Sequence, residues 1–213
     1  MSTIILDLSS GNTCHNDKTI VKQMIDVIKA IDAGKHKIIL KFQLFIDDGI
    51  NIPLEHEIFD YAYKYGNEQG YKVTSSVADL ESLKFLLQYD VPFVKIPNDR
   101  KLDWLIGEVP RKILVYVSYA EFLRDVFIHE NQRSLICVSE YPATIEQYKK
   151  VFGSNPFAIQ CNGFHGISDH TINFGLWYKY EPEIIEWHFK LEDSTGFDAG
   201  EFARTPAMLK EII

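Results

Sequence analysis

The sequence contains few cysteines, and they follow no ligand or disulfide pattern. Three occur in 213 residues, at positions 14, 137 and 161, and no two of them form a C-x-x-C pair. A sparse, odd set argues against a disulfide framework and favours a reducing compartment. The amino terminus, MSTIILDLSSG, has no basic segment followed by a long apolar one. We therefore expect no signal peptide and a cytoplasmic location.

Long apolar runs and an excess of positive charge are also missing. No apolar run approaches the roughly 18 residues that a membrane span needs. The formal net charge is −8 and no block of like charges occurs, so neither nucleic acid nor an anionic membrane is an expected partner. No glycine-rich phosphate loop follows the first predicted strand, which weakens a dinucleotide-binding interpretation. With 46% hydrophobic and 24% charged residues, the composition is that of a globular protein.

Short apolar runs alternate with longer amphipathic segments along the chain. Strands are predicted over 3–9, 37–45, 71–77, 92–97, 112–118, 134–140, 156–162 and 184–191. Helices are predicted over 18–33, 54–69, 79–89, 101–108, 119–129, 144–153, 169–180 and 205–212. Such alternation indicates a parallel sheet with crossover helices. Eight units predict an α/β fold, a compact (β/α)8 TIM barrel forming a single domain over 1–213; an open doubly wound sheet is the alternative.

Polar residues recur at every second position of most predicted strands, towards the carboxyl end. In 184–191, Glu186, His188 and Lys190 alternate with apolar residues. Alternate residues of a barrel strand face the interior, where unpaired charges are costly. We therefore expect an active site at the carboxyl-terminal mouth, although a sheet with one wet face would show the same alternation. The inward set includes Asp7, Lys41, Lys95, Ser139, Tyr141, Glu186 and His188.

Two predicted inward lysines favour a small anion as ligand. Lys41 and Lys95 would repel each other unless an anion lay between them, and an ammonium group binds phosphate or carboxylate as a point charge. Ser139, Ser168 and Asn162 could add neutral hydrogen-bond donors. The pattern thus favours a small, multiply charged anion.

Two histidines near the ends of the last two predicted strands are candidate metal ligands. Because neighbouring barrel strands end close together, His170 and His188 could share one Mn, Zn or Fe ion with open coordination positions. Glu186 or Asp169 could be a further ligand or an outer partner. A spacing of 18 residues is no ligand signature, and a hydrogen-bonded core histidine is the alternative interpretation.

Seven segments, taken in order, resemble the N-acetylneuraminate (sialic acid) synthase family. They are LKFQLF (40–45), DLESLKFL (79–86), VPFVKI (91–96), CVSEYPA (137–143), GISDHT (166–171), IIEWHFKL (184–191) and TGFDAGEF (195–202). The succession K-F-Q, S-D-H-T and E-x-H-F is specific as a set. The resemblance covers nearly the whole chain as a compact version of that family's barrel, and we expect no carboxyl-terminal antifreeze-like domain.

The resemblance implies a metal-dependent condensation of phosphoenolpyruvate with an N-acetylated aldose. It implies a divalent metal, Mn²⁺ being the expected ion, held by His170 and His188. It implies catalytic roles for Asp7, Lys95 and Glu186. The positions that match substrate-binding residues are Lys41, Lys95, Asn98, Ser139, Tyr141, Ser168 and Asp198. The expected partners are phosphoenolpyruvate and an amino sugar, and a homo-oligomer is left open.

Several positions depart from the family pattern, among them three in the predicted substrate site. Asn98 stands where the family has a phosphate-binding serine, Ser139 where it usually has asparagine, and Arg100 where it has an acid that contacts substrate. Two alternatives therefore stay open. One is a degenerate barrel that acts as a binding or assembly protein, and the other is a metal-dependent aldolase or isomerase acting on a sugar phosphate.

Overall fold

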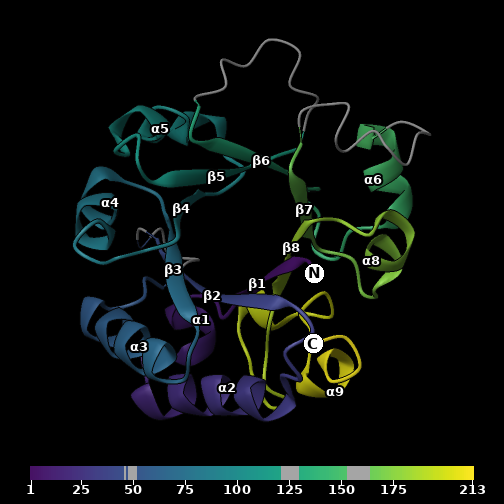
Figure 1. Ribbon diagram of the computed structural model, residues 1–213, viewed down its shortest axis with the longest axis horizontal. Coiled ribbons are helices and arrows are strands. Elements are labelled where there is room, and N and C mark those ends of the chain that lie inside the picture. Colours follow the sequence, from purple (N-terminus) through teal and green to yellow (C-terminus); the bar gives the residue numbers. More distant parts are fainter. Residues whose placement is uncertain (46, 48–51, 121–129, 153–163) are drawn as a thin grey trace.

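The computed structural model describes residues 1–45, 47, 52–120, 130–152 and 164–213 (Figure 1). Within these residues, parallel strands close into a barrel in which each strand pairs with the next and the last pairs with the first. The predicted (β/α)8 barrel is therefore confirmed. The strands are β1 (Thr3–Asp7), β2 (Lys37–Leu44), β3 (Lys72–Val77), β4 (Phe93–Ile96), β5 (Leu114–Tyr119), β6 (Gln132–Ile136), β7 (Gly166–Asp169) and β8 (Ile184–His188).

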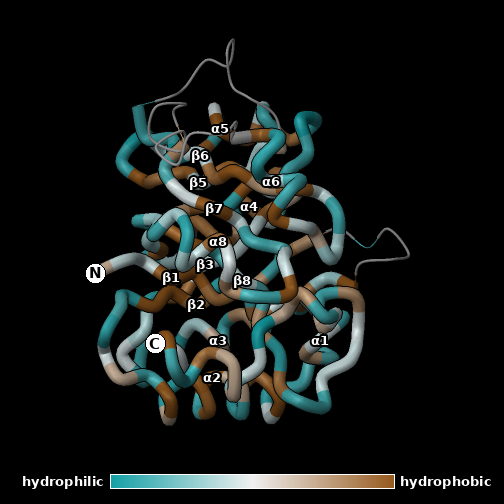
Figure 2. Tube along the Cα trace, turned by 90° about the vertical axis from the view of Figure 1, so that its right-hand side faces the viewer, coloured by the Kyte–Doolittle hydropathy of each residue, from teal (hydrophilic) through white to brown (hydrophobic). Residues whose placement is uncertain are grey.

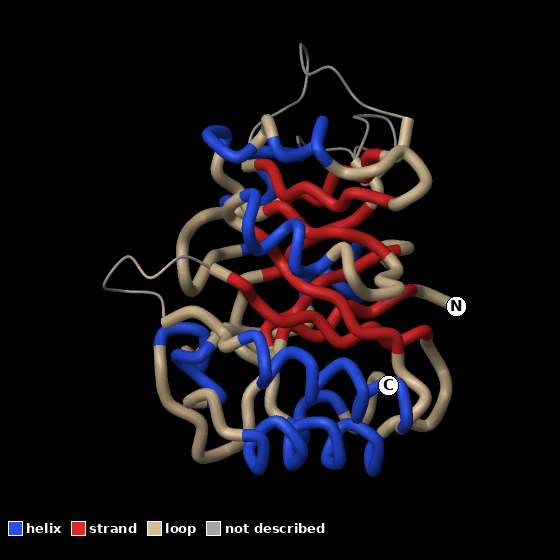
Figure 3. Tube along the Cα trace, turned by 90° about the vertical axis from the view of Figure 1, so that its left-hand side faces the viewer, coloured by secondary structure: helices blue, strands red, loops and turns tan. Residues whose placement is uncertain are grey.

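Helices surround the barrel on the outside (Figures 1 and 3). In α2, Val21, Met24, Ile25 and Ile28 form one buried face, and Asp17 caps the first turn by accepting from the backbone N–H of Thr19. The helices are α1 (Gly11–Cys14), α2 (Lys18–Ile31), α3 (His56–Glu68), α4 (Leu80–Leu86), α5 (Leu105–Glu108), α6 (Ile145–Phe152), α8 (Gly175–Tyr180) and α9 (Pro206–Leu209), with 3-10 turns η1 (Arg100–Leu102) and η2 (Phe197–Ala199). In the described part of the chain, no helix combines the length and apolarity needed to cross a membrane.

The seventh unit differs from its sequence prediction. The predicted strand 156–162, which includes Asn162, lies outside the described residues. The same holds for most of the predicted helix 119–129 of the fifth unit. The strand β7 is formed by Gly166–Asp169, where a loop and the start of a helix were expected. Gly166 has a physical role there, because a Cβ at this position would lie 2.2 Å from the backbone oxygen of Ile184 on β8. Only glycine permits this close approach of the two strands.

The barrel interior has an apolar layer below a polar one. Ile5, Ile39, Phe93, Tyr116 and Leu135 form a buried cluster of their own, separate from the larger core between strands and helices. Colouring by hydropathy shows the strands largely apolar, whereas α2 alternates between apolar and polar residues (Figure 2). Two residues further along the same inward face, polar side chains replace the apolar ones, namely Asp7, Lys41, Lys95, Ser118 and Cys137. The apolar layer thus closes the bottom of the barrel and leaves a polar cavity at its carboxyl-terminal end.

Candidate active site

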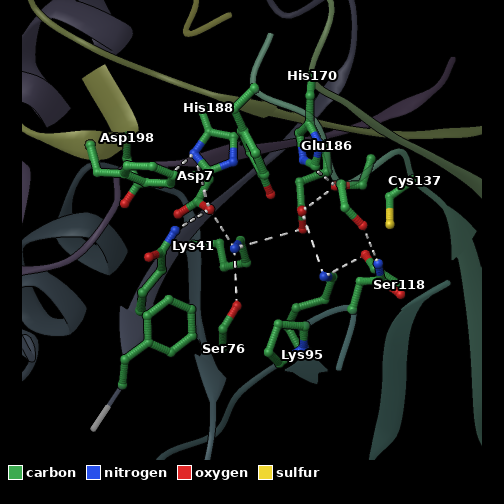
Figure 4. Close-up of a pocket in the computed structure, with 18 residues that line it drawn as sticks. Asp7, Lys41, Ser76, Lys95, Ser118, Cys137, His170, Glu186, His188 and Asp198 are labelled. Atoms are coloured by element: carbon green, nitrogen blue, oxygen red, sulfur yellow. Dashed lines mark hydrogen bonds and ion pairs between the residues drawn. The ribbon is translucent and has the colours of Figure 1, made fainter. Parts of the chain in front are cut away.

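A cavity of about 260 Å³ opens at the carboxyl ends of the strands (Figure 4), the end at which TIM-barrel enzymes carry their active sites. The structure brings together the eleven residues to which the family resemblance assigns a role. They are Asp7, Lys41, Lys95, Asn98, Ser139, Tyr141, Ser168, His170, Glu186, His188 and Asp198.

The β1 and β2 ends contribute a buried ion pair. Lys41 Nζ lies 2.6 Å from Asp7 Oδ2 and donates to Ser76 Oγ at 3.0 Å. Asp7 also accepts from Gln43 Nε2 at 2.7 Å, so its carboxylate is held from two sides. Burial alone would lower the pKa of Lys41, but the carboxylates of Asp7 and Glu186 outweigh it and raise the pKa above the ordinary value. Lys41 is therefore a cation at neutral pH.

Glu186 lies between the two lysines. Its Oε2 is 3.8 Å from Lys41 Nζ, its Oε1 is 3.6 Å from Lys95 Nζ, and Ser168 Oγ donates to Oε1 at 2.8 Å. Burial acts to raise the pKa of Glu186, but Lys41 and Lys95 outweigh it and hold that pKa at about 2. Burial lowers the pKa of Lys95, which donates to Ser118 Oγ at 2.8 Å. The anion expected between the lysines is thus supplied in part by the protein itself.

His170 is anchored through one ring nitrogen. Its Nδ1 lies 2.6 Å from the backbone oxygen of Val138, so Nδ1 carries the proton and Nε2 keeps its lone pair. The ring stacks on Tyr141 with the ring centroids 4.1 Å apart. Burial, together with nearby His188, lowers the pKa of His170 to about 3. The imidazole is therefore neutral at physiological pH, the form that binds metals.

The second imidazole lies within reach of the first. The ring centroids of His170 and His188 are 5.5 Å apart, and two rings that share an ion with bonds of about 2.0–2.1 Å have centroids about 5 Å apart. A histidine whose other nitrogen donates to a backbone carbonyl, as in His170, is typical of metal ligands. In the described residues, no group of three or more His, Cys, Asp or Glu side chains could hold a metal. The pair thus fits a divalent ion that keeps open positions for water or substrate.

The acidic side of the cavity is formed by β1 and the loop after β8. His188 Nδ1 lies 3.6 Å from Asp7 Oδ2 and 3.4 Å from Asp198 Oδ1. Asp198 belongs to η2, which follows Gly196 at φ 100°; a Cβ on this glycine would lie 2.2 Å from the backbone oxygen of Asn12. Burial raises the pKa of Asp198, while His188 opposes that rise. Gly196 therefore allows the loop to pack against α1 and to place Asp198 over the mouth.

Several buried polar atoms of the cavity have no hydrogen-bond partner among the described residues. They are Gln43 Oε1, Glu186 Oε2 and His188 Nδ1. Nearly all buried polar atoms in folded proteins are hydrogen-bonded, and an unsatisfied one costs about 1–3 kcal/mol. Three such atoms lining one cavity indicate that a bound ligand completes the site.

No protein-family model and no curated protein matches the chain, but solved structures do. The N-acetylneuraminic acid (sialic acid) synthetase of Leptospira borgpetersenii serovar Hardjo-bovis, in complex with citrate, aligns over 98% of this chain and 80% of that one, with 19% identity and a TM-score of 0.71. The putative spore coat polysaccharide biosynthesis protein E of Chromobacterium violaceum aligns over 99% and 72%, with 15% identity and a TM-score of 0.76. The chain has the fold of the sialic acid synthetase barrel. The resemblance carried by the sequence motifs is confirmed for the fold.

An aldolase is also similar to this barrel. Phospho-2-dehydro-3-deoxyheptonate aldolase (DAHP synthase) of Thermotoga maritima aligns over 99% of this chain and 66% of that one, with 13% identity and a TM-score of 0.69. By their names, this neighbour and the synthetase are enzymes. The barrel is thus of a kind that enzymes use.

Several polar residues of the cavity were not among the residues expected from the sequence. Gln43 binds Asp7, while Ser76 and Ser118 each accept from a lysine on the preceding strand. Cys137 lines the floor, where burial raises its pKa to about 12. Strand alternation is the signal that could have found the two serines. Ser76 lies opposite the inward-facing Gln43 in the β2–β3 ladder, and Ser118 follows the inward-facing Tyr116 by two residues.

Three residues lie elsewhere than the sequence analysis suggests, and none is among the described residues that line the cavity. Asp169 points to the opposite face, where it pairs with Arg204 at 3.0 Å, so the suggestion of a metal ligand there is wrong. Lys190 donates to the backbone oxygens of Ala199 and Gly200. Arg100 pairs with Asp103 at 3.3 Å and lies over the ring of Tyr119, so it leaves the cavity unobstructed.

Proposed function

We propose that this protein condenses phosphoenolpyruvate with an N-acetylated aldose in a reaction that depends on a divalent metal ion, with Mn²⁺ as the expected ion. The observation that carries the proposal is the cavity itself. Two buried lysines share Glu186, two imidazoles lie side by side, and polar atoms that line the same space lack hydrogen-bond partners among the described residues. This donor set fits an anion, a metal ion and a hydroxylated acceptor held together.

The side formed by β4, β5 and β6 offers donors for the phosphate and carboxylate groups. Lys95 and Ser118 lie beside the pair formed by Asn98 and Ser139, in which Asn98 Nδ2 donates to Ser139 Oγ at 2.8 Å. Because Ser139 Oγ already accepts this bond, its own proton is free to donate into the cavity. An ammonium group with several hydroxyl and amide donors is a suitable cradle for a phosphate.

The charges of the cavity favour a cation as a co-ligand. Three acidic residues, Asp7, Glu186 and Asp198, line the cavity with two lysines, Lys41 and Lys95. Carboxylates beside the imidazole pair would repel a multiply charged anion. A divalent cation held by the imidazole pair would offset this repulsion. When bound, such an ion would act as a Lewis acid towards the acceptor's carbonyl oxygen.

The residues of this chain would then position and balance the reaction. The enol carbon of phosphoenolpyruvate forms a bond to the aldehyde carbon, and the aldehyde oxygen takes up a proton. Water adds to the resulting cationic carbon and gives up a proton, which replaces the one that the aldehyde oxygen took up. The new hydroxyl group passes its remaining proton to the phosphate as the bond between that carbon and the phosphate oxygen breaks, which leaves a keto acid and hydrogen phosphate. Glu186, ionised between Lys41 and Lys95, would orient the incoming water by accepting a hydrogen bond from it. Holding two reactants in one cavity contributes much of such a rate enhancement.

The mouth of the cavity suits a sugar-like acceptor. Tyr141 and Phe197 are partly exposed, with ring centroids 5.7 Å apart, and offer flat apolar faces at the rim. Gln43 Oε1 and the Asp198 carboxylate lie deeper and can accept hydrogen bonds from hydroxyl groups. Apolar faces combined with hydroxyl acceptors match the two sides of a pyranose or open-chain aldose.

Phosphate release tests the proposal. Purified protein is incubated with phosphoenolpyruvate, Mn²⁺ and a panel of N-acetylated aldoses, and inorganic phosphate and new nine-carbon-type keto acids are measured by colorimetry and mass spectrometry. Lys95→Met should abolish release, whereas Lys72→Met, which removes an exposed lysine paired with Asp90, should not. The proposal fails if no acceptor gives product. Turnover of a sugar phosphate without phosphoenolpyruvate would instead support an aldolase or isomerase.

A further inference from the structure

A fully buried ion pair lies just outside the cavity, at the ends of the strands that carry the two histidines. Asp169 Oδ2 and Arg204 Nη2 are 3.0 Å apart, and both side chains have an exposed fraction of 0%. Trp187 Nε1 donates to the same carboxylate oxygen at 2.9 Å. Asp169 directly precedes His170, and Trp187 directly precedes His188. We call Arg204, Asp169 and Trp187 the arginine clip.

The guanidinium group of the clip fastens the segment that carries His170. Nη2 donates to the backbone oxygen of Asn173 at 2.9 Å in addition to Asp169, and Nη1 donates to the backbone oxygens of Thr171 and Phe202. Three of these four acceptors belong to residues 169–173. The planar fork of arginine can serve several acceptors at fixed angles, which the ammonium group of lysine cannot do.

The backbone of Arg204 fastens the strand that carries His188. Its N–H donates to the backbone oxygen of His188 at 2.7 Å, and its carbonyl accepts from the N–H of Lys190 at 3.0 Å. One residue therefore holds β8 through its main chain and the end of β7 through its side chain. Both imidazoles project from these same strand ends into the cavity on the other side (Figure 4).

Stability alone does not account for such an arrangement. Burying two charges costs several kcal/mol per ion, and a well-packed apolar pair of similar size is often as stable or more stable. A buried pair with fixed hydrogen bonds instead holds the segments that it joins in one relative position. We propose that Arg204 is a positioning residue that sets the separation of His170 and His188 at the value a shared divalent ion needs. This inference rests on the metal dependence of the proposed function.

The test uses two variants and two readouts. Arg204→Met removes the fork and leaves Asp169 unpaired, while Asp169→Asn/Arg204→Met removes both charges and so avoids a lone buried carboxylate. Mn²⁺ affinity is measured by titration calorimetry, and we expect both variants to bind Mn²⁺ about 10- to 100-fold more weakly, the usual effect of losing an outer partner of a metal ligand. In metal-free protein with ¹⁵N-labelled histidine, we expect the His170 Nδ1–H to lose its protection from solvent exchange in both variants.

A matched control separates positioning from general destabilisation. Tyr71→Phe removes a hydrogen bond of 2.9 Å to Asp32 at the amino-terminal end of β3, the end away from the cavity. It should lower the thermal midpoint without changing Mn²⁺ affinity or the His170 signal. The double variant should recover thermal stability relative to Arg204→Met but should not recover Mn²⁺ affinity.

The outcomes distinguish this inference from the proposed function. Wild-type affinity and wild-type exchange protection in both variants would overturn the positioning role, as would recovery of both by the charge-free double variant. Tight Mn²⁺ binding without condensation in the wild type would count against the proposed function and leave the clip standing. If the wild type binds no Mn²⁺, the metal dependence fails, and the exchange measurement alone then decides the role of Arg204.

Discussion

Replacing Glu186 by glutamine removes the negative charge that separates the two buried lysines while keeping the size of the side chain. In the folded protein the pKa of Glu186 is held at about 2 instead of 4.5, because Lys41 and Lys95 outweigh the effect of burial. A shift of about 2.5 pKa units corresponds to about 3 kcal/mol, at 1.36 kcal/mol per unit. We therefore expect Glu186→Gln to lower the free energy of unfolding at pH 7 by about 3 kcal/mol.

The pH dependence gives the sign of this effect. Since the folded-state pKa is depressed, the contribution is complete above pH 4.5 and is lost as the pH falls from 4.5 towards 2. The difference in stability between the wild type and Glu186→Gln should therefore shrink across that window. Urea unfolding followed by circular dichroism, at steps between pH 7 and pH 3, measures it.

The same substitution should have the opposite effect on anion binding. With the charge of Glu186 removed, Lys41 and Lys95 face the cavity with less compensation, and metal-free protein should bind phosphoenolpyruvate more tightly. A variant as stable as the wild type at pH 7, or one that binds the anion more weakly, would refute the placement of Glu186 as the internal counter-ion of the lysines.

Two further predictions concern the cavity walls. Asn98 donates a hydrogen bond to Ser139, and a hydrogen bond contributes about 1 kcal/mol. Asn98→Ser and Ser139→Asn should therefore each weaken phosphoenolpyruvate binding about fivefold, and the double exchange should recover most of the loss. Calorimetry that finds additive losses would contradict the pairing. Cys137 is 1% exposed, and burial raises its pKa to about 12. Because the thiolate is the reactive species, iodoacetamide at pH 8 should not modify Cys137 in the native protein. Rapid labelling of Cys137 in peptide mass spectra would show that the cavity floor is open.

The parts of the site that follow from the sequence are those governed by strand alternation. In β8 the period of two is strict over Glu186, Trp187 and His188, so the inward and outward faces can be assigned without coordinates. In the structure the same rule places Ser168 and Asp169 on opposite faces of β7. The suggestion that Asp169 is a metal ligand failed because no strand was expected at 166–169, so alternation could not be applied there.

The parts that the sequence does not reveal depend on distances between strands. The four residues of β7, GISD, contain too few apolar side chains for a strand signal, and their extended form is set by pairing with β6 and β8. The sequence predicts that the two lysines face one space. It does not predict that Glu186 lies within 4 Å of both lysines. The sequence around Arg204, ARTP, is typical of an exposed loop and does not indicate a buried ion pair. Only the fold brings Asp169 next to Arg204.

The central claim is that the imidazoles and the lysines hold a metal ion and a phosphorylated anion in one cavity. Crystals grown with Mn²⁺ and phosphoenolpyruvate, measured near the manganese absorption edge, test it most directly. We expect an anomalous peak within bonding distance of His170 and His188, with the phosphate within hydrogen-bonding distance of Lys95, Asn98 or Ser139. Imidazoles without a metal peak, or an anion bound only outside the cavity, would contradict it.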